Sequence, residues 1–166
     1  MKRTGPKAIA LGGVLAALAV LIMLLGGLIP VATYVCPLLC CMILGIVVRV
    51  CGIRIAWAWY GAVSILSILL APDKEAAAVF FFIGYYPIVK LKMDHLTLPW
   101  LWKLLLFNSA ILAMYYLLMT VMGMNSLSED FAELGKIGLI IMLLMGNFIF
   151  ILLDRLLGMN FRRRKS

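Results

Sequence analysis

Long uninterrupted apolar runs dominate this sequence and limit what it can fold into. The first extends from Ala8 to Ile29 without a charged residue, and a bilayer core roughly 30 Å thick needs about 20 such residues per helix. Hydrophobic residues make up 66% of the 166-residue chain and charged residues only 13%, whereas soluble domains contain about 25% charged residues. The sequence therefore predicts an all-α integral membrane protein with no separate soluble domain.

The apolar stretch from Val31 to Ala71 is too long for one crossing. At 1.5 Å per residue it would reach about twice the hydrocarbon thickness, so the chain has to turn back within it. Arg49, Gly52 and Arg54 mark the turn, because the guanidinium groups can reach water at the membrane edge while glycine permits a tight reversal. This stretch therefore predicts two antiparallel spans.

Pro72 ends the third apolar run and starts a fourth helix. Asp73 is its predicted N-cap, and a first-turn Glu75 is favoured by the helix dipole. Whether this helix continues through Gly84 and Pro87 is left open by the sequence. The single membrane domain is predicted to have six spans, at residues 8–29, 31–48, 55–71, 73–89, 101–124 and 137–157, with an interfacial helix on the outer surface at 126–135.

Basic residues gather on one side of this layout. When the loops are assigned alternately to the two sides, every lysine and arginine except Lys74 and Lys136 lies on the side of the C-terminal tail. By the positive-inside rule this side is cytoplasmic. We therefore expect a protein of the bacterial plasma membrane with both termini in the cytoplasm. The net charge of +8 is thereby explained by orientation, and we expect no nucleic-acid partner.

Signatures of catalysis are missing from the sequence. It has one histidine, His95, and no nucleophile elbow, P-loop or zinc motif. We therefore expect no enzymatic activity, no cofactor and no resident metal. Cys36 and Cys40 lie one helical turn apart, which leaves a path for Cu(I) as an alternative to ordinary packing cysteines.

Small residues recur at helical spacing along the first span. Ala8, Gly12 and Ala16 occupy every fourth position, and Gly13 and Ala17 form a neighbouring row. Such rows let another helix approach closely, and association in lipid depends on this packing. Internal packing of the bundle and docking on a partner protein explain these rows equally well.

Polar residues predicted near the outer surface form a second candidate site. Charged and hydroxyl groups that converge beside apolar walls can bind a small molecule. The alternative is a set of solvated loop residues and a helix cap. The candidate substrate-binding residues are Tyr34, Ser67, Asp73, Lys74, Glu75, Tyr116, Glu129 and Asp130.

Three further polar residues lie inside predicted spans. Lipid offers no hydrogen-bond partner, so Asn108 and Asn147 are expected to face protein and to link helices. Asp154 is expected to pair with Arg155 or Lys103, because an isolated carboxylate in the membrane would be costly.

The layout and the opening segment KAIALGGVLAALAV resemble the substrate-binding S components of energy-coupling factor (ECF) transporters. The segment LLAPDKEAAAVFFFIGYYPIVK also resembles a family of uncharacterised small six-helix membrane proteins of Gram-positive bacteria. The first resemblance implies that Gly12 with Ala16, or Gly13 with Ala17, docks on a membrane coupling subunit served by ATPases. It also implies that a vitamin, metal or similar micronutrient binds on the outer side.

Two functional hypotheses follow. The first is a substrate-capture subunit of an ECF-type importer, with the lipid bilayer, the coupling subunit and a small-molecule ligand as partners. The second is a non-transporting membrane scaffold or assembly factor, in which the same small-residue face binds a partner and the outer acids face water.

Overall fold

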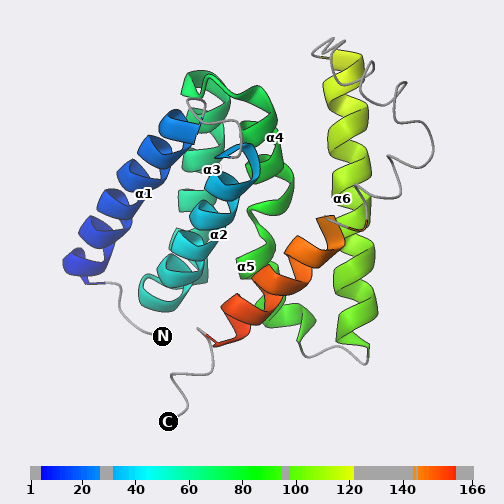
Figure 1. Cartoon of the computed structure of the whole chain (residues 1–166). Coiled ribbons are helices and arrows are strands. Elements are labelled where there is room, and N and C mark those ends of the chain that lie inside the picture. Colours follow the sequence, from blue (N-terminus) through cyan, green and yellow to red (C-terminus); the bar gives the residue numbers. More distant parts are fainter. Residues whose placement is uncertain (1–4, 27–31, 95–97, 122–143, 145, 160–166) are drawn as a thin grey trace.

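A computed structural model describes residues 5–26, 32–94, 98–121, 144 and 146–159, and within these ranges the chain is helical without strands (Figure 1). The predicted all-α class is thus confirmed. The helices are α1 (Pro6–Gly26), α2 (Ala32–Val50), α3 (Ile53–Leu70), α4 (Lys74–Ile83), α5 (Tyr86–Met93) and α6 (Pro99–Val121), followed by a terminal helix over residues 146–159.

Among the described residues, four helical stretches are long and apolar enough to cross a membrane. They are Pro6–Gly26, Thr33–Val50, Ile53–Leu70 and Lys74–Met93, and Pro99–Met114 is a shorter apolar stretch. These helices are consistent with a membrane-embedded protein. The expected outer helix at 126–135 and the first part of the expected sixth span lie outside the described residues.

The helices α1 to α4 run in alternating directions. α1 starts, α2 ends and α3 starts at one end, which carries Lys7, Arg49 and Arg54 (Figure 1). α3 ends and α4 starts at the opposite end, which carries Asp73 and Glu75. We call these the basic end and the acidic end of the bundle.

The turn between α2 and α3 is built on Gly52, as the sequence predicts. Its backbone has a φ of +90°, a conformation in which a side chain would be strained. Gly52 is the residue preceding the first turn of α3. The reversal therefore needs glycine, and it places α2 and α3 side by side.

Small side chains fill the interior where α1 to α4 meet. Ala19, Cys40, Ala56 and Ala76 are fully buried, and they let the backbones approach closely, as helix packing in lipid requires. Gly45 has the same role for the terminal helix, because a Cβ at this position would lie 2.9 Å from Leu157 Cδ2. The terminal helix thus lies directly against α2.

The fourth predicted span is interrupted at Gly84 and Tyr85, between α4 and α5. Pro87 has no N–H with which to bond the carbonyl of the preceding turn, so the helical ladder fails here. A Cβ at Gly84 would lie 2.3 Å from the carbonyl oxygen of Phe80, so only glycine fits. The break keeps both residues in right-handed helical conformation, so α4 and α5 form one broken span.

The loop after this span is shorter than expected. The predicted spans 73–89 and 101–124 leave residues 90–100 as a loop, but α5 continues to Met93 and α6 begins at Pro99. The reason is that Lys90 is buried and forms an ion pair inside the protein, so its ammonium does not need to reach water.

Candidate functional site

Asp73 joins α4 to α2 at the acidic end. One carboxylate oxygen accepts a hydrogen bond from the Ala76 backbone N–H at 3.0 Å, which confirms Asp73 as the N-cap of α4. The other accepts a hydrogen bond from Thr33 Oγ1 of α2 at 2.7 Å. One side chain thus satisfies a free N–H of the helix terminus and ties two helices together.

The neighbouring charged residues make similar contacts. The Tyr34 hydroxyl donates to Glu75 Oε1 at 2.8 Å, again between α2 and α4. Lys74 Nζ donates to the carbonyl oxygen of Ile68 at 2.8 Å, near the end of α3. The structure therefore brings Tyr34, Lys74 and Glu75 together with Asp73, as the candidate site requires.

The other candidate binding residues are placed differently. Ser67 is only 1% exposed on the inner face of α3, and its hydroxyl has no hydrogen-bond partner among the described residues. Tyr116 is 73% exposed on α6. Glu129 and Asp130 lie outside the described residues. The part of the candidate site that the structure assembles is thus the junction of α2 and α4.

The first row of small residues on α1 is used for internal packing. Trp59 Nε1 of α3 donates to the carbonyl oxygen of Gly12 at 3.1 Å, and Cys51 Sγ donates to that of Ala8 at 3.0 Å. A Cβ at Gly12 would lie 3.6 Å from Cys51 Sγ, and Ala16 packs against the core. This row lets α1 approach α3 closely.

The second row of α1 points away from the bundle. Gly13 and Ala17 are exposed, and a Cβ at Gly13 would meet no atom of the described residues within 4 Å. Exposed Val14 and Leu21 border this row. The structure thus separates two rows that look equivalent in the sequence, and leaves the row of Gly13 and Ala17 uncovered by the described residues.

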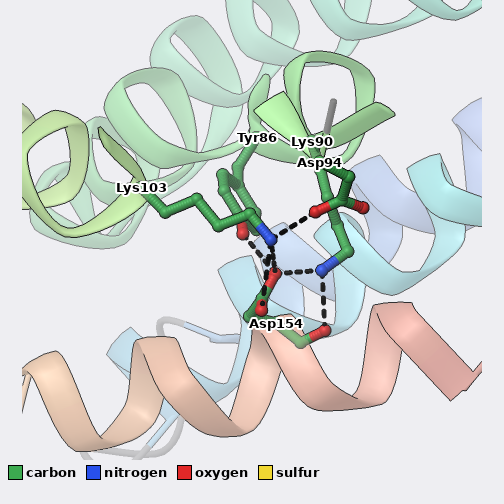
Figure 2. Close-up of polar contacts among 5 residues, drawn as sticks. All are labelled: Tyr86, Lys90, Asp94, Lys103 and Asp154. Carbon is green, nitrogen blue, oxygen red and sulfur yellow. Dashed lines mark hydrogen bonds and ion pairs between the residues drawn. The ribbon is translucent and has the colours of Figure 1, made fainter. Parts of the chain in front are cut away.

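Five polar residues meet near the basic end, where α5, α6 and the terminal helix come together (Figure 2). Lys90 of α5 forms an ion pair with Asp154 of the terminal helix and also donates to its backbone carbonyl at 3.0 Å. Lys103 of α6 lies 3.3 Å from Asp154 Oδ1 and forms a second ion pair with Asp94. The Tyr86 hydroxyl donates to Asp154. We call these residues the Asp154 cluster.

The Asp154 cluster buries its cations and balances them. Lys90 is 3% exposed and Lys103 is 6% exposed, and such burial is costly unless each charge is paired. Within the cluster the ammonium groups of Lys90 and Lys103 are matched by the carboxylates of Asp94 and Asp154. Ionisable residues inside a membrane protein commonly mark functional positions, so the cluster is a second candidate site.

Of the two predicted partners of Asp154, Lys103 is confirmed. Lys103 is a partner, whereas Arg155 is exposed. Lys90 was missed, because its position at the end of an apolar run indicates an interfacial lysine. The sequence does contain one signal for this contact: Lys90 is four residues from Tyr86, and residues four apart on a helix share one face.

Asn108 and Asn147 link α6 to the terminal helix, as predicted. Each amide Nδ2 donates to the side-chain oxygen of the other at 3.2 Å. Asn108 also donates to the carbonyl oxygen of Leu104 at 2.9 Å. The polar groups of these helices are thereby satisfied away from lipid.

The thiols of the chain lie in the packed interior. All four cysteines are free and buried, and Cys40 Sγ donates to the carbonyl oxygen of Ala19 at 3.5 Å. Among the described residues, no group of three or more His, Cys, Asp or Glu side chains is placed to hold a metal ion.

No protein-family model, curated protein or solved structure matches this chain. The features of the molecule that bear on function are thus the geometry of α1, of the acidic end and of the Asp154 cluster.

Proposed function

We propose that this chain is the membrane-embedded substrate-capture subunit of an ECF-type micronutrient importer. In this proposal six helices cross the bacterial plasma membrane, and the basic end, with both termini, faces the cytoplasm. The chain docks through α1 on a membrane coupling subunit, whose ATPases supply the energy. The observation that carries the proposal is the uncovered row of Gly13 and Ala17.

A row of small residues that the described part of the chain leaves uncovered is a surface on which another helix can pack in lipid. Lipid tails are as apolar as leucine, so helices associate through close packing rather than through a hydrophobic drive. α1 packs mainly on α2 and α3 and lies at the edge of the bundle (Figure 1). Its first row already provides the close approach to α3, and the second row offers a partner helix the same kind of surface.

The acidic end supplies the capture site in this proposal. Asp73 and Glu75 lie beside the hydroxyl groups of Thr33 and Tyr34 at the end opposite the basic residues. A ligand with cationic or hydroxyl groups can exchange with the Tyr34 hydroxyl for Glu75. This places ligand binding on the outer side and partner docking along α1.

One observation favours a membrane scaffold as the second candidate function. Asp73 already accepts hydrogen bonds from Thr33 and from the α4 backbone, and Glu75 accepts one from Tyr34. These bonds hold α2 and α4 together, a role that needs no ligand. In a scaffold the row of Gly13 and Ala17 still binds a partner, but nothing is captured at the acidic end.

Purification of the tagged protein from its native membrane tests the proposal. We expect ATPases of the importer to co-purify with the wild type and to be lost from Gly13→Leu, because leucine fills the space that a partner helix would occupy. Gly61→Leu on α3 is the matched control, since a Cβ at Gly61 would also meet no atom of the described residues within 4 Å. Mass spectrometry of the complex then identifies a bound small molecule.

Each outcome separates the candidates. ATPases with a bound micronutrient support the capture subunit. A partner without ATPases or ligand, lost in Gly13→Leu, supports the scaffold instead. Equal loss of the partner in Gly13→Leu and Gly61→Leu, or recovery of the wild type alone, contradicts docking through this row.

A further inference from the structure

α5 links the break in the fourth span to the Asp154 cluster, whatever the function of the chain. This eight-residue helix begins directly after the break at Gly84 and Tyr85. Its other end carries Lys90 and is followed by Asp94, both in the Asp154 cluster. A short helix thus directly follows a discontinuity, and it is joined to the Asp154 cluster by Tyr86 at its start and by Lys90 one turn later.

The break is stabilised by a side chain from α3. The Tyr60 hydroxyl donates a hydrogen bond to the carbonyl oxygen of Phe81, and the Tyr60 ring packs edge-on against Tyr85 with 6.2 Å between centroids. Phe81 lies four residues before Tyr85 at the break, and in a bilayer a carbonyl that loses its helical partner has to be satisfied from a neighbouring helix. A side-chain hydroxyl can rotate and exchange hydrogen-bond partners, whereas the backbone hydrogen bonds of a continuous helix hold successive turns together. The chain is therefore suited to bend at this break.

Two polar contacts of α5 converge on one carboxylate. Tyr86 and Lys90 lie one turn apart on α5, and both donate to Asp154 of the terminal helix (Figure 2). Buried ion pairs add little stability compared with apolar packing, and their best-attested use is to select one arrangement among several. The Asp154 carboxylate, which α5 and α6 both contact, therefore determines the position of α5.

We propose that α5 is a lever with two positions, which pivots at the break between Gly84 and Pro87 and is held in the position seen here by Asp154. When Asp154 is released from Tyr86 and Lys90, α5 moves away from the terminal helix while α1 to α4 keep their packing. The device works at the basic end and moves only the last part of the broken span.

Distances between spin labels on the full chain test the lever. One label replaces Lys92 on α5 and the other Arg54 at the start of α3, both exposed at the basic end. The native cysteines are buried, so the labels react at the introduced cysteines. A second pair, at Lys7 on α1 and at Arg54, reports whether the rest of the bundle changes.

We expect one narrow distance distribution for Lys92 to Arg54 in the wild type. Asp154→Asn should add a second population several ångströms away, because Lys90 loses its carboxylate, while the Lys7 pair stays unchanged. Asp94→Asn is the matched control and should keep the single population, since Lys103 retains Asp154. Asp154→Glu should keep it too, because the carboxylate remains.

The pivot is tested by adding Pro87→Ala to Asp154→Asn. Alanine restores the N–H that the ladder lacks, so the second population should shrink. An unchanged Lys92 distance in Asp154→Asn, or equal broadening of the Lys7 pair, would overturn the lever. A second population that persists undiminished with Pro87→Ala would overturn the pivot at this break.

Discussion

At the scale of single residues, Asp154 differs from the other acids because it contacts α5 and α6 at once. Lys90 has Asp154 as its carboxylate partner, whereas Lys103 has Asp154 and Asp94. Loss of Asp154 therefore leaves the buried Lys90 ammonium without a countercharge. Loss of Asp94 leaves Lys103 paired, and the Asp94 side chain is exposed enough for water to replace its contacts.

This difference predicts unequal effects for the same chemical change. Asp154→Asn should destabilise the protein by about 3–5 kcal/mol, because it strands a buried charge. Asp94→Asn should cost less than about 1 kcal/mol, as expected for a partly exposed pair. Thermal unfolding of both variants in detergent, followed by circular dichroism, measures the difference. Equal losses of stability would show that Lys90 does not depend on Asp154.

The residues that sequence reasoning placed correctly have few alternatives open to them. Asn108 and Asn147 can satisfy their amides only against protein if they lie in a bilayer, and the structure pairs them. Asp73 follows Pro72 at the start of an apolar run, where an N-cap is needed. Lys90 has two alternatives, since a lysine at the end of a span can reach water or a buried acid. The sequence does not distinguish them.

At the scale of helices, the two rows of α1 have different roles. Gly12 lies against Cys51 and accepts a hydrogen bond from Trp59, whereas a Cβ at Gly13 would meet no described atom within 4 Å. The sequence shows both rows but not which one faces inward, because α1 is apolar on every side. Only the position of α3 decides this.

Leucine substitutions on α1 should separate these roles in the isolated protein. Gly12→Leu should lower stability by about 1–3 kcal/mol, the usual cost of overpacking, because its side chain overlaps Cys51. Gly13→Leu should leave stability unchanged within about 0.5 kcal/mol, as for surface changes. Unfolding of both variants in detergent checks this, and a destabilised Gly13→Leu would mean that its row is covered inside the protein.

Two substitutions of Asp73, the N-cap of α4, distinguish its structural hydrogen bonds from the effect of its negative charge. Asp73→Ala removes the cap and the Thr33 contact and should cost about 0.5–2 kcal/mol. Asp73→Asn keeps an oxygen that accepts from Ala76, so it should be nearly as stable as the wild type while lacking the charge. Thermal unfolding ranks these variants. A strongly destabilised Asp73→Asn would show that the charge itself is needed to join α2 and α4.

The position of the break in the fourth span was visible in the sequence, but its consequence was not. Gly84 and Pro87 indicate an interruption, whereas the hydroxyl that bonds the Phe81 carbonyl at the break comes from Tyr60 on α3. Such a contact depends on how two helices are rotated against each other. Local propensity does not contain this information.

At the scale of the whole molecule, the helical class follows from the length of the apolar runs, and the direction of each helix from the short turns between them. α1 to α4 alternate as these features indicate, and α5 continues the direction of α4. The arrangement of the cysteines, the Asp154 cluster and the two faces of α1 depends on long-range packing, which the order of apolar runs does not determine. The proposed capture of a substrate at the acidic end further requires the basic end to face the cytoplasm.

Labelling of single introduced cysteines in intact cells tests this orientation most directly. Pro72, between α3 and α4, and Gly5, before α1, are exposed at opposite ends of the bundle, and the native cysteines are buried. We expect a membrane-impermeant maleimide to label Pro72→Cys in intact cells, and Gly5→Cys only after the membrane is permeabilised. Labelling of Gly5→Cys in intact cells, with Pro72→Cys protected, would contradict the proposed orientation and the outward-facing capture site.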